Sequence, residues 1–168
     1  INDVSKHSID VKNIVFNYLH DKIKNEYESE FTLDELRITF EHEIKVLKNG
    51  PYKDIFSKNP EMFMLKEAEL LEKESTNQQS LVLKIFQKRV KENKSVIIVI
   101  DNVDRSSESF QEEIYALSHL ITQASGATVI ITLREFTFFK NKDKGFLDVR
   151  PEDKIIHLKS PDFNKLIS

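Results

Sequence analysis

The chain of 168 residues contains no cysteine. This absence excludes disulfide bonds, thiolate metal sites and a cysteine nucleophile, and it fits a reducing compartment, so we expect a cytoplasmic protein. No apolar run approaches the length that spans a bilayer, so we expect no membrane partner. A large excess of positive charge is also missing, because the formal net charge is −3. That balance disfavours nucleic acid as a partner, since sequence-independent binding usually needs a basic stripe.

Several catalytic motifs are missing as well. The five histidines are scattered, and none forms an H-x-x-x-H or H-E-x-x-H pair, so we expect no histidine zinc site. Serine and histidine show no nucleophile-elbow spacing. The chain has three glycines, and none of them precedes Lys-Ser or Lys-Thr. The sequence therefore lacks a G-x-x-x-x-G-K-[ST] loop, whose backbone N–H groups cradle phosphates.

What is present, 39% hydrophobic and 32% charged residues, is typical of a globular chain, and the length suits one domain. The most informative segment is the apolar run Val96–Ile100, which ends abruptly in Asp101. A run of β-branched residues without alternation predicts a strand of a parallel sheet that is buried on both faces. Ligands of open α/β sheets bind outside the carboxyl ends of such strands. Asp101 is therefore expected at the edge of a crevice, where an ionised carboxylate can hold a hard cation.

The following residues predict a βαβ unit. A polar turn leads into an amphipathic helix over about Phe110 to Ala124, Gly126 is expected just after its end, and Ala127–Arg134 is a second apolar strand with polar residues at its end. Because parallel strands end at the same side of a sheet, Asp101, Asp104 and Arg134 should converge there. The apolar positions at helical spacing are Phe110, Ile114, Leu117 and Ile121.

The segment Asp101-Asn102-Val103-Asp104-Arg105, together with Thr132-Leu133-Arg134, resembles the Walker B and sensor 1 half of a STAND-class or KAP-like P-loop ATPase with an AAA-like core. The resemblance covers about Ser95–Ser168. It implies a partial three-layer α/β/α core with a parallel sheet, and ATP and Mg²⁺ as cofactors. The resemblance implies that Asp101 binds Mg²⁺ through water and that Asp104 orients or deprotonates the attacking water. It implies that Thr132 and Arg134 sense the terminal phosphate. Arg105 would contact phosphate or a neighbouring subunit.

Two departures from the family pattern qualify this interpretation. Asn102 stands where many of these enzymes have a second acid, and an amide cannot accept a proton at neutral pH, so hydrolysis is expected to be slow or to use Asp104. The phosphate loop is absent, the chain starts at Ile1 rather than Met, and it stops part-way into an expected helix over Phe163–Ser168. We therefore expect a fragment that is inactive by itself, with the loop upstream of Ile1 in a longer protein.

The first 94 residues are expected to form a helical insertion of about four helices before the Walker B strand, and residues 95–168 to form part of the ATPase core of a single truncated domain. The first expected helix begins at Ser8 or Asp10 and carries the apolar residues Val11, Ile14, Val15, Tyr18, Leu19 and Ile23. The second runs from the capping box Thr32-Leu33-Asp34-Glu35 to Leu47 and is ended by Asn49-Gly50-Pro51. Pro60 opens the third, and the fourth carries Leu81, Val82, Ile85, Phe86 and Val90.

Beyond the second strand, Lys140–Gly145 is expected to be a lysine-rich loop, with the preceding phenylalanines Phe136, Phe138 and Phe139 packed on the sheet. Lys154–Leu158 is expected to be a further short strand, and Ser160-Pro161-Asp162 the start of a final helix.

These features favour part of a nucleotide-dependent signalling switch, of the kind used in bacterial defence, that acts through a protein partner or self-association. Two alternatives stay open. The chain can be a catalytically silent scaffold whose helices bind a protein partner. It can also be a metal-dependent nuclease, although such a site needs a third converging acid beyond Asp101 and Asp104. Each residue also has a structural interpretation, since an Asp after a strand can cap the next helix and Arg105 can form a surface salt bridge.

Overall fold

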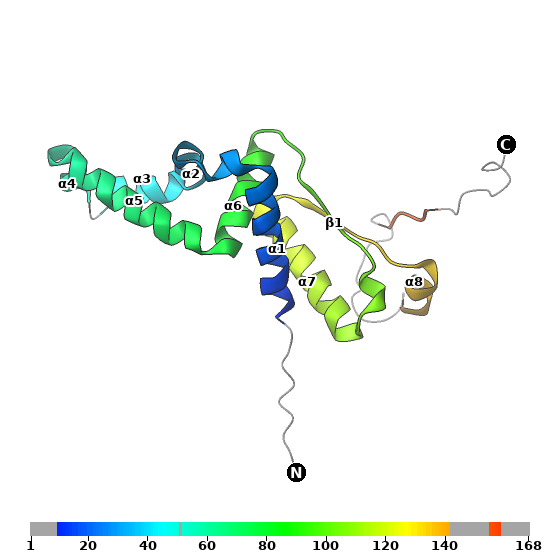
Figure 1. Cartoon of the computed structure of the whole chain (residues 1–168). Coiled ribbons are helices and arrows are strands. Elements are labelled where there is room, and N and C mark those ends of the chain that lie inside the picture. The colour runs from blue at the N-terminus through cyan, green and yellow to red at the C-terminus, as the bar shows by residue number, and fades with distance from the viewer. Residues whose placement is uncertain (1–9, 51, 142–154, 159–168) are drawn as a thin grey trace, which may run out of the picture.

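The computed structural model describes residues 10–50, 52–141 and 155–158. Helices dominate these residues, and the strands form one small sheet (Figure 1). The elements are α1 (Val11–Glu26), η1 (Glu28–Phe31), α2 (Leu33–Thr39), α3 (Glu41–Asn49), α4 (Lys53–Lys58), α5 (Pro60–Thr76), α6 (Gln78–Lys91), β1 (Ile97–Ile100), η2 (Val103–Arg105), α7 (Glu108–Ser125), β2 (Thr128–Ile131) and α8 (Glu135–Asn141), where η denotes a 3₁₀ helix.

The predicted βαβ unit is confirmed. Strands β1 and β2 pair in parallel, with Ile97 opposite Thr128 and Ile100 opposite Ile131, and α7 connects them. Gly126 ends α7 with a left-handed φ of 76°, a conformation in which a Cβ atom would be strained. Its N–H donates to the carbonyl of Thr122, which closes the last turn of the helix. The return of the chain therefore places both strand ends at one edge of the sheet.

The prediction that β1 is buried on both faces is wrong for the described residues. Ile97 is 61% exposed and Val99 is 59% exposed, whereas Ile98 and Ile100 are half-buried against the core. The physical reason is that the inward face packs on residues from α1 and α7, while nothing in the described part of the chain covers the other face. A full three-layer core is therefore not formed by these residues, which make two layers.

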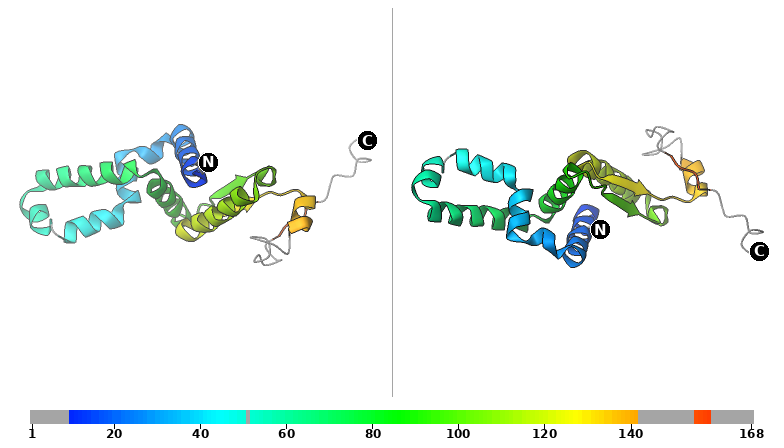
Figure 2. Two further views of the ribbon diagram at one scale, coloured as in Figure 1. Left: turned by 90° about the horizontal axis from the view of Figure 1, so that it is seen from below. Right: turned by 90° about the horizontal axis from the view of Figure 1, so that it is seen from above.

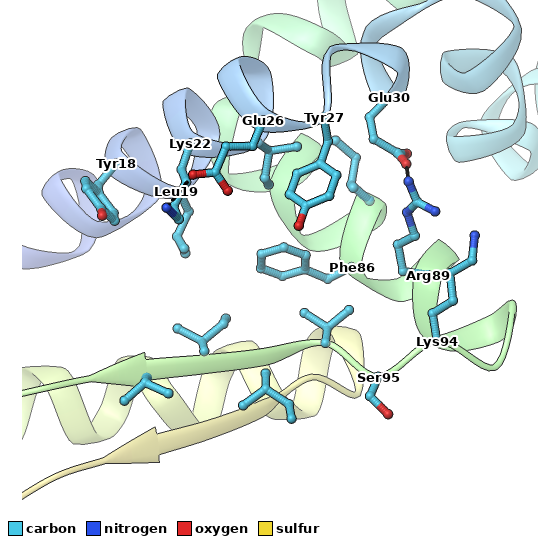
Figure 3. Close-up of a pocket in the computed structure, with 16 residues that line it drawn as sticks. Tyr18, Leu19, Lys22, Glu26, Tyr27, Glu30, Phe86, Arg89, Lys94 and Ser95 are labelled. Carbon is cyan, nitrogen blue, oxygen red and sulfur yellow. Dashed lines mark hydrogen bonds and ion pairs between the residues drawn. The ribbon is translucent and has the colours of Figure 1, made fainter.

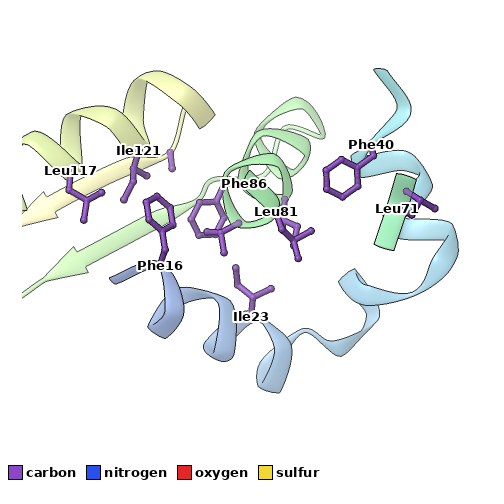
Figure 4. Packing of buried hydrophobic residues seen from close by; sticks show 11 residues of the cluster. Phe16, Ile23, Phe40, Leu71, Leu81, Phe86, Leu117 and Ile121 are labelled. Carbon is purple, nitrogen blue, oxygen red and sulfur yellow. The ribbon is translucent and has the colours of Figure 1, made fainter. Parts of the chain in front are cut away.

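The core is built around α6, which packs against α1, α2, α5 and α7. Phe16 of α1 and Ile121 of α7 meet Phe86 of α6 near the sheet, and Phe40 extends the core toward α5 (Figure 4). The other buried members of this core are Ile23, Leu71, Leu81, Val82, Ile85, Leu117 and Ala127.

The apolar face expected for α1 is only partly correct. Ile23 is buried, as expected, whereas Ile14 and Tyr18 are mostly exposed.

The helical region contains more helices than expected. The predicted second helix is divided into α2 and α3 at Phe40, whose φ of −106° and ψ of 25° break the helical path, and α4 follows as an additional short helix. Phe40 is fully buried, so packing of its ring accompanies the break. Pro60 opens α5, as predicted. Helices α3, α4 and α5 form an arm that extends away from α1 and α7 (Figure 2). None of the described helices has the length and apolarity to cross a membrane.

The predicted capping box at Thr32 does not form. Thr32 is the residue before α2, but its hydroxyl donates backward to the carbonyl of Ser29 at 2.9 Å and caps no helix N–H. Glu35, the other half of the expected box, accepts instead from the Lys88 Nζ at 2.6 Å. A tertiary ion pair has therefore replaced the local hydrogen bond.

Lys88 belongs to a buried ion network that joins η1 and α2 to α6. Its ammonium group contacts the carboxylates of Glu30 and Glu35, and Arg89 also pairs with Glu30. The Glu30 side chain is 3% exposed and the Lys88 side chain 7% exposed. Buried charges are tolerated only when they are paired, so each member depends on the others.

The chain after β2 differs from the expectation. The segment from Glu135 to Asn141 is helix α8, so the predicted loop begins in a helix, and Lys142–Gly145 lies outside the described residues. The predicted packing of the phenylalanines on the sheet is wrong for Phe136 and Phe139, which are 77% and 54% exposed.

The predicted strand at Lys154–Leu158 is not formed over residues 155–158, where Ile156 is 84% exposed and no neighbouring strand provides hydrogen bonds. His157 instead contacts the rings of Phe138 and Phe139, with centroid distances of 5.3 and 6.1 Å. Lys154 and the expected helix over Ser160–Ser168 lie outside the described residues.

The buried network gives a stability prediction. Replacing Lys88→Met keeps the length of the side chain but leaves Glu30 and Glu35 without their shared cation, so we expect unfolding to become easier by about 3 kcal/mol. Urea denaturation monitored by circular dichroism measures this change. Lys22→Met is the matched control, because Lys22 pairs with Glu26 while both side chains are about half exposed, and it should change stability little. Equal effects of the two substitutions would contradict the assignment of the Lys88 network as a stabilising element.

Candidate functional site

The candidate site lies at the carboxyl edge of the sheet. Asp101 directly follows β1 and Thr132 directly follows β2, so the parallel register brings the two residues side by side. The Thr132 N–H donates to the carbonyl of Ile100 at 3.0 Å, which extends the pairing of the strands by one residue. Its hydroxyl donates to the Asp101 Oδ1. The two strand ends are therefore joined by a side-chain hydrogen bond as well as by the backbone.

A tight turn follows Asp101. Asn102 adopts φ 58° and ψ 27°, the left-handed region in which asparagine is one of the few tolerated side chains. Its backbone N–H donates to Asp101 Oδ1 and its side-chain amide donates to Asp101 Oδ2, both at 2.8 Å. The Asp101 carboxylate is thus oriented by its own neighbour, while the residue remains exposed to solvent.

Val103 anchors this turn to the core. It is 3% exposed and packs with Val11 of α1 and Ile114 of α7, against the half-buried Ile100 and Leu133. Burial of the valine fixes the short helix η2 and separates the acid before it from the acid after it. Asp101 consequently faces solvent, whereas the side chain of Asp104, within η2, contacts Arg134 and Thr137 after β2.

Asp104 forms the second link between the strand ends. Its side chain is 1% exposed, and its Oδ2 accepts from the Arg134 Nε at 2.5 Å and from the Thr137 Oγ1 at 3.1 Å. Hydrogen bonding from Arg134 lowers the pKa of the Asp104 carboxyl; burial opposes the effect, and the Thr137 hydroxyl adds to it. Asp104 therefore stays ionised at neutral pH and is a weak proton acceptor, which suits a positioning role better than that of a general base.

The sequence-predicted residues are thus brought together in two pairs, Asp101 with Thr132 and Asp104 with Arg134. Arg105 does not join them. It is exposed, and although its backbone N–H donates to the carbonyl of Asn102, its side chain forms no hydrogen bond or ion pair with any residue that the structure describes. The roles assigned to these five residues on sequence grounds remain predictions.

Sequence reasoning missed two residues of this site, Val103 and Thr137. Thr137 lies in the first turn of α8, three residues after Arg134. Residues three apart share one face of a helix, so a helix placed directly after Arg134 would have indicated the contact. The phenylalanines around Thr137 were expected to pack on the sheet, and no helix was expected directly after Arg134, so this signal was not used.

The next question is which side chains at the sheet edge could bind a metal ion. No cluster of three or more acidic, histidine or cysteine side chains suited to hold a metal occurs in the part of the chain that the structure describes. Asp101 offers a single exposed carboxylate. A nuclease site built from several converging acids receives no support from the described residues.

The best-formed cavity in the described residues is a separate feature. It has a volume of about 500 Å³ and lies between α1, α6 and the beginning of β1 (Figure 3). Tyr18, Tyr27 and Phe86 line it together with Arg89, which is paired with Glu30. None of the five sequence-predicted residues belongs to this cavity. The candidate site is therefore an exposed sheet edge and not an enclosed pocket.

The Asp104 pair gives a prediction with a definite sign. Because the folded pKa lies below the usual value of 3.8, the pair stabilises the fold fully above that pH, and the stabilisation is lost as pH falls through the folded pKa. Arg134→Gln should raise the pKa of Asp104 toward 3.8, which a ¹³C carboxyl NMR titration measures. Arg105→Gln is the control, since the Arg105 side chain forms no ion pair with either acid among the described residues, and it should leave the titration of Asp104 unchanged. An unaltered pKa in Arg134→Gln would show that the pair does not exist in solution.

Comparison with known proteins agrees with this geometry. No curated protein and no solved structure gives a significant match to the chain. The sequence model of the KAP family P-loop domain, however, matches residues 2–137. This range covers most of the chain and includes α1 to α7, both strands and the paired residues Asp101, Asp104, Thr132 and Arg134. The chain therefore belongs to the KAP family of P-loop NTPase domains.

Proposed function

We propose that the chain forms the Walker B and sensor 1 part of a nucleotide-binding KAP domain, with Asp101 holding Mg²⁺ through water and with Thr132 and Arg134 directed at the terminal phosphate of ATP. The observation that carries the proposal is the pairing of Thr132 with Asp101 and of Arg134 with Asp104 across the ends of two parallel strands. Family membership supports a nucleotide ligand. Ligands of parallel α/β sheets bind at this edge.

The residues at this edge suit magnesium. Mg²⁺ prefers hard oxygen donors, keeps several waters, and is usually bound by one or two carboxylates together with phosphates of the substrate. Asp101 supplies an exposed carboxylate whose orientation is fixed by three hydrogen bonds, from Asn102 and Thr132. When bound, Mg²⁺ would neutralise charge on the phosphates.

Arg134 suits a terminal phosphate. Its side chain is 63% exposed, and its contact with Asp104 uses Nε, so no described residue accepts from its terminal nitrogens. The planar guanidinium matches the oxygens of a phosphate group with parallel N–H donors.

The chain does not supply a cradle for the inner phosphates, because it has no glycine-rich loop that precedes Lys-Ser or Lys-Thr. We therefore propose that a further segment of a longer natural protein contributes that loop and covers the open face of β1 at Ile97 and Val99. In this arrangement residues 1–94 are a helical insertion, and residues 95–168 are the continuation of the nucleotide domain.

The chemistry of the site supports a switch rather than a rapid enzyme. Asn102 cannot accept a proton, and Asp104 is engaged by Arg134 and has a lowered pKa, so neither residue is a strong general base. Slow hydrolysis would leave the nucleotide-bound state long-lived. A long-lived state suits a cytoplasmic signalling ATPase of the STAND type, including those of bacterial defence, that acts through a protein partner or self-association.

The role of Asp101 can be tested in the full natural protein. Asp101→Asn keeps the hydrogen-bonding size of the side chain but removes the charge that holds Mg²⁺, so we expect kcat for ATP hydrolysis to fall roughly 100-fold or more. Steady-state phosphate release at saturating Mg²⁺ and ATP measures the change. Asp54→Asn, at an exposed position of α4 in the arm, is the control. Unchanged hydrolysis in Asp101→Asn would exclude this acid as the magnesium ligand.

A second test concerns the missing loop. Isothermal titration calorimetry with the 168-residue polypeptide should detect no micromolar binding of Mg·ATP, because the inner phosphates have no backbone N–H donors to bind. The full natural protein should bind the same ligand. Micromolar binding by the 168 residues alone would overturn the proposal that the loop comes from another segment.

A further inference from the structure

We propose that Asp104 and the terminal phosphate of the nucleotide compete for Arg134, and that Thr137 transmits the exchange to helix α8. This inference rests on the proposed function and adds a regulated element to it. The link to α8 was not apparent from the sequence, because Thr137 and the helical state of α8 came from the structure.

The first argument is the unequal exposure of the two charges. The Asp104 side chain is 1% exposed, whereas the Arg134 side chain is 63% exposed. An anion in solution can therefore reach the guanidinium without displacing any other described side chain, while the carboxylate stays enclosed. A phosphate carries more negative charge than a carboxylate and accepts from a guanidinium at two oxygens, so it competes effectively for Arg134.

The second argument is that one oxygen holds α8. Asp104 Oδ2 accepts from both Arg134 Nε and Thr137 Oγ1, and α8 begins between these two residues at Glu135. Helix α8 has seven residues, which is too short to be stable without tertiary contacts. Its aromatic side chains Phe138 and Phe139 contact His157, a residue that lies after α8 in the chain and not in the sheet. Asp104 is thus the polar attachment of α8 to the body of the domain.

These two arguments combine into a mechanism. If Arg134 moves to a phosphate, the enclosed Asp104 carboxylate loses its counter-ion, and an unpaired buried charge is strongly unfavourable. Asp104 then relieves the cost by taking up a proton or by turning toward solvent. Both responses weaken its hydrogen bond to Thr137, so α8 is released from the sheet edge when nucleotide binds. Arg134 and Thr137 are linked because both donate to the same oxygen of Asp104. Thr137 acts through Asp104 and is therefore a positioning residue.

The test uses hydrogen–deuterium exchange of the α8 amides in the full natural protein, with and without saturating Mg·ATP, and calorimetry of the same samples. In the unaltered protein, nucleotide should speed exchange of α8 roughly tenfold, the factor that corresponds to losing about one charge-assisted hydrogen bond. In Thr137→Val, which removes the hydroxyl at nearly constant size, α8 should exchange fast already and should not respond to nucleotide. Thr137→Ser keeps the hydroxyl and should behave like the unaltered protein.

Asp104→Asn tests the competition itself. The amide keeps the shape of the side chain but is a weaker partner for a guanidinium, so Arg134 is freed, and we expect the nucleotide to bind roughly tenfold more tightly. Weaker or unchanged binding in this variant would contradict competition. Calorimetric binding without any change of α8 exchange, or with slower exchange, would overturn this inference alone. Absence of any calorimetric binding by the full natural protein would overturn the proposed function, and the inference with it.

Discussion

The parallel pairing of β1 and β2 is the constraint on which the candidate site depends. The register places Ile100 opposite Ile131, so the next residues, Asp101 and Thr132, emerge side by side. An antiparallel pair would put the start of one strand beside the end of the other, and the acids and Arg134 would lie at opposite edges. The parallel arrangement requires α7 as the connection, and burial of Ile114, Leu117 and Ile121 on one face of that helix fixes its path.

Below the sheet edge, hydrophobic burial controls where polar groups can point. Val103 is enclosed by Val11 and Ile114, and this anchor lets Asp101 remain in solvent while Asp104 is enclosed against Arg134 and Thr137. The left-handed Asn102 makes the abrupt change of direction possible. Val103 and Asn102 therefore place Asp101 and Asp104 in different environments, although the two aspartates are only three residues apart. This separation of an exposed acid from an enclosed one assigns the two aspartates different roles in the proposed function.

The helical half of the chain shows how far local patterns extend. Pro60 marks a helix boundary there, as Gly126 does at the end of α7, because their effects are local: a fixed φ and a tolerated positive φ. Thr32 and Phe40 did not follow their local patterns. The partner of Glu35 is Lys88, more than fifty residues away, and the ring of Phe40 is enclosed by a core that several helices build. No periodicity within a short window contains that information.

The sequence by itself determined the βαβ unit, the end of α7 at Gly126, and the convergence of two acids, a threonine and an arginine at one sheet edge, because strand run, helical period and glycine act over a few residues. The tertiary structure alone decided which acid is exposed, that Thr137 shares an oxygen with Arg134, and that one face of β1 is open. Those outcomes depend on burial and on pairing between residues about thirty positions apart, and both arise only when separate elements pack together.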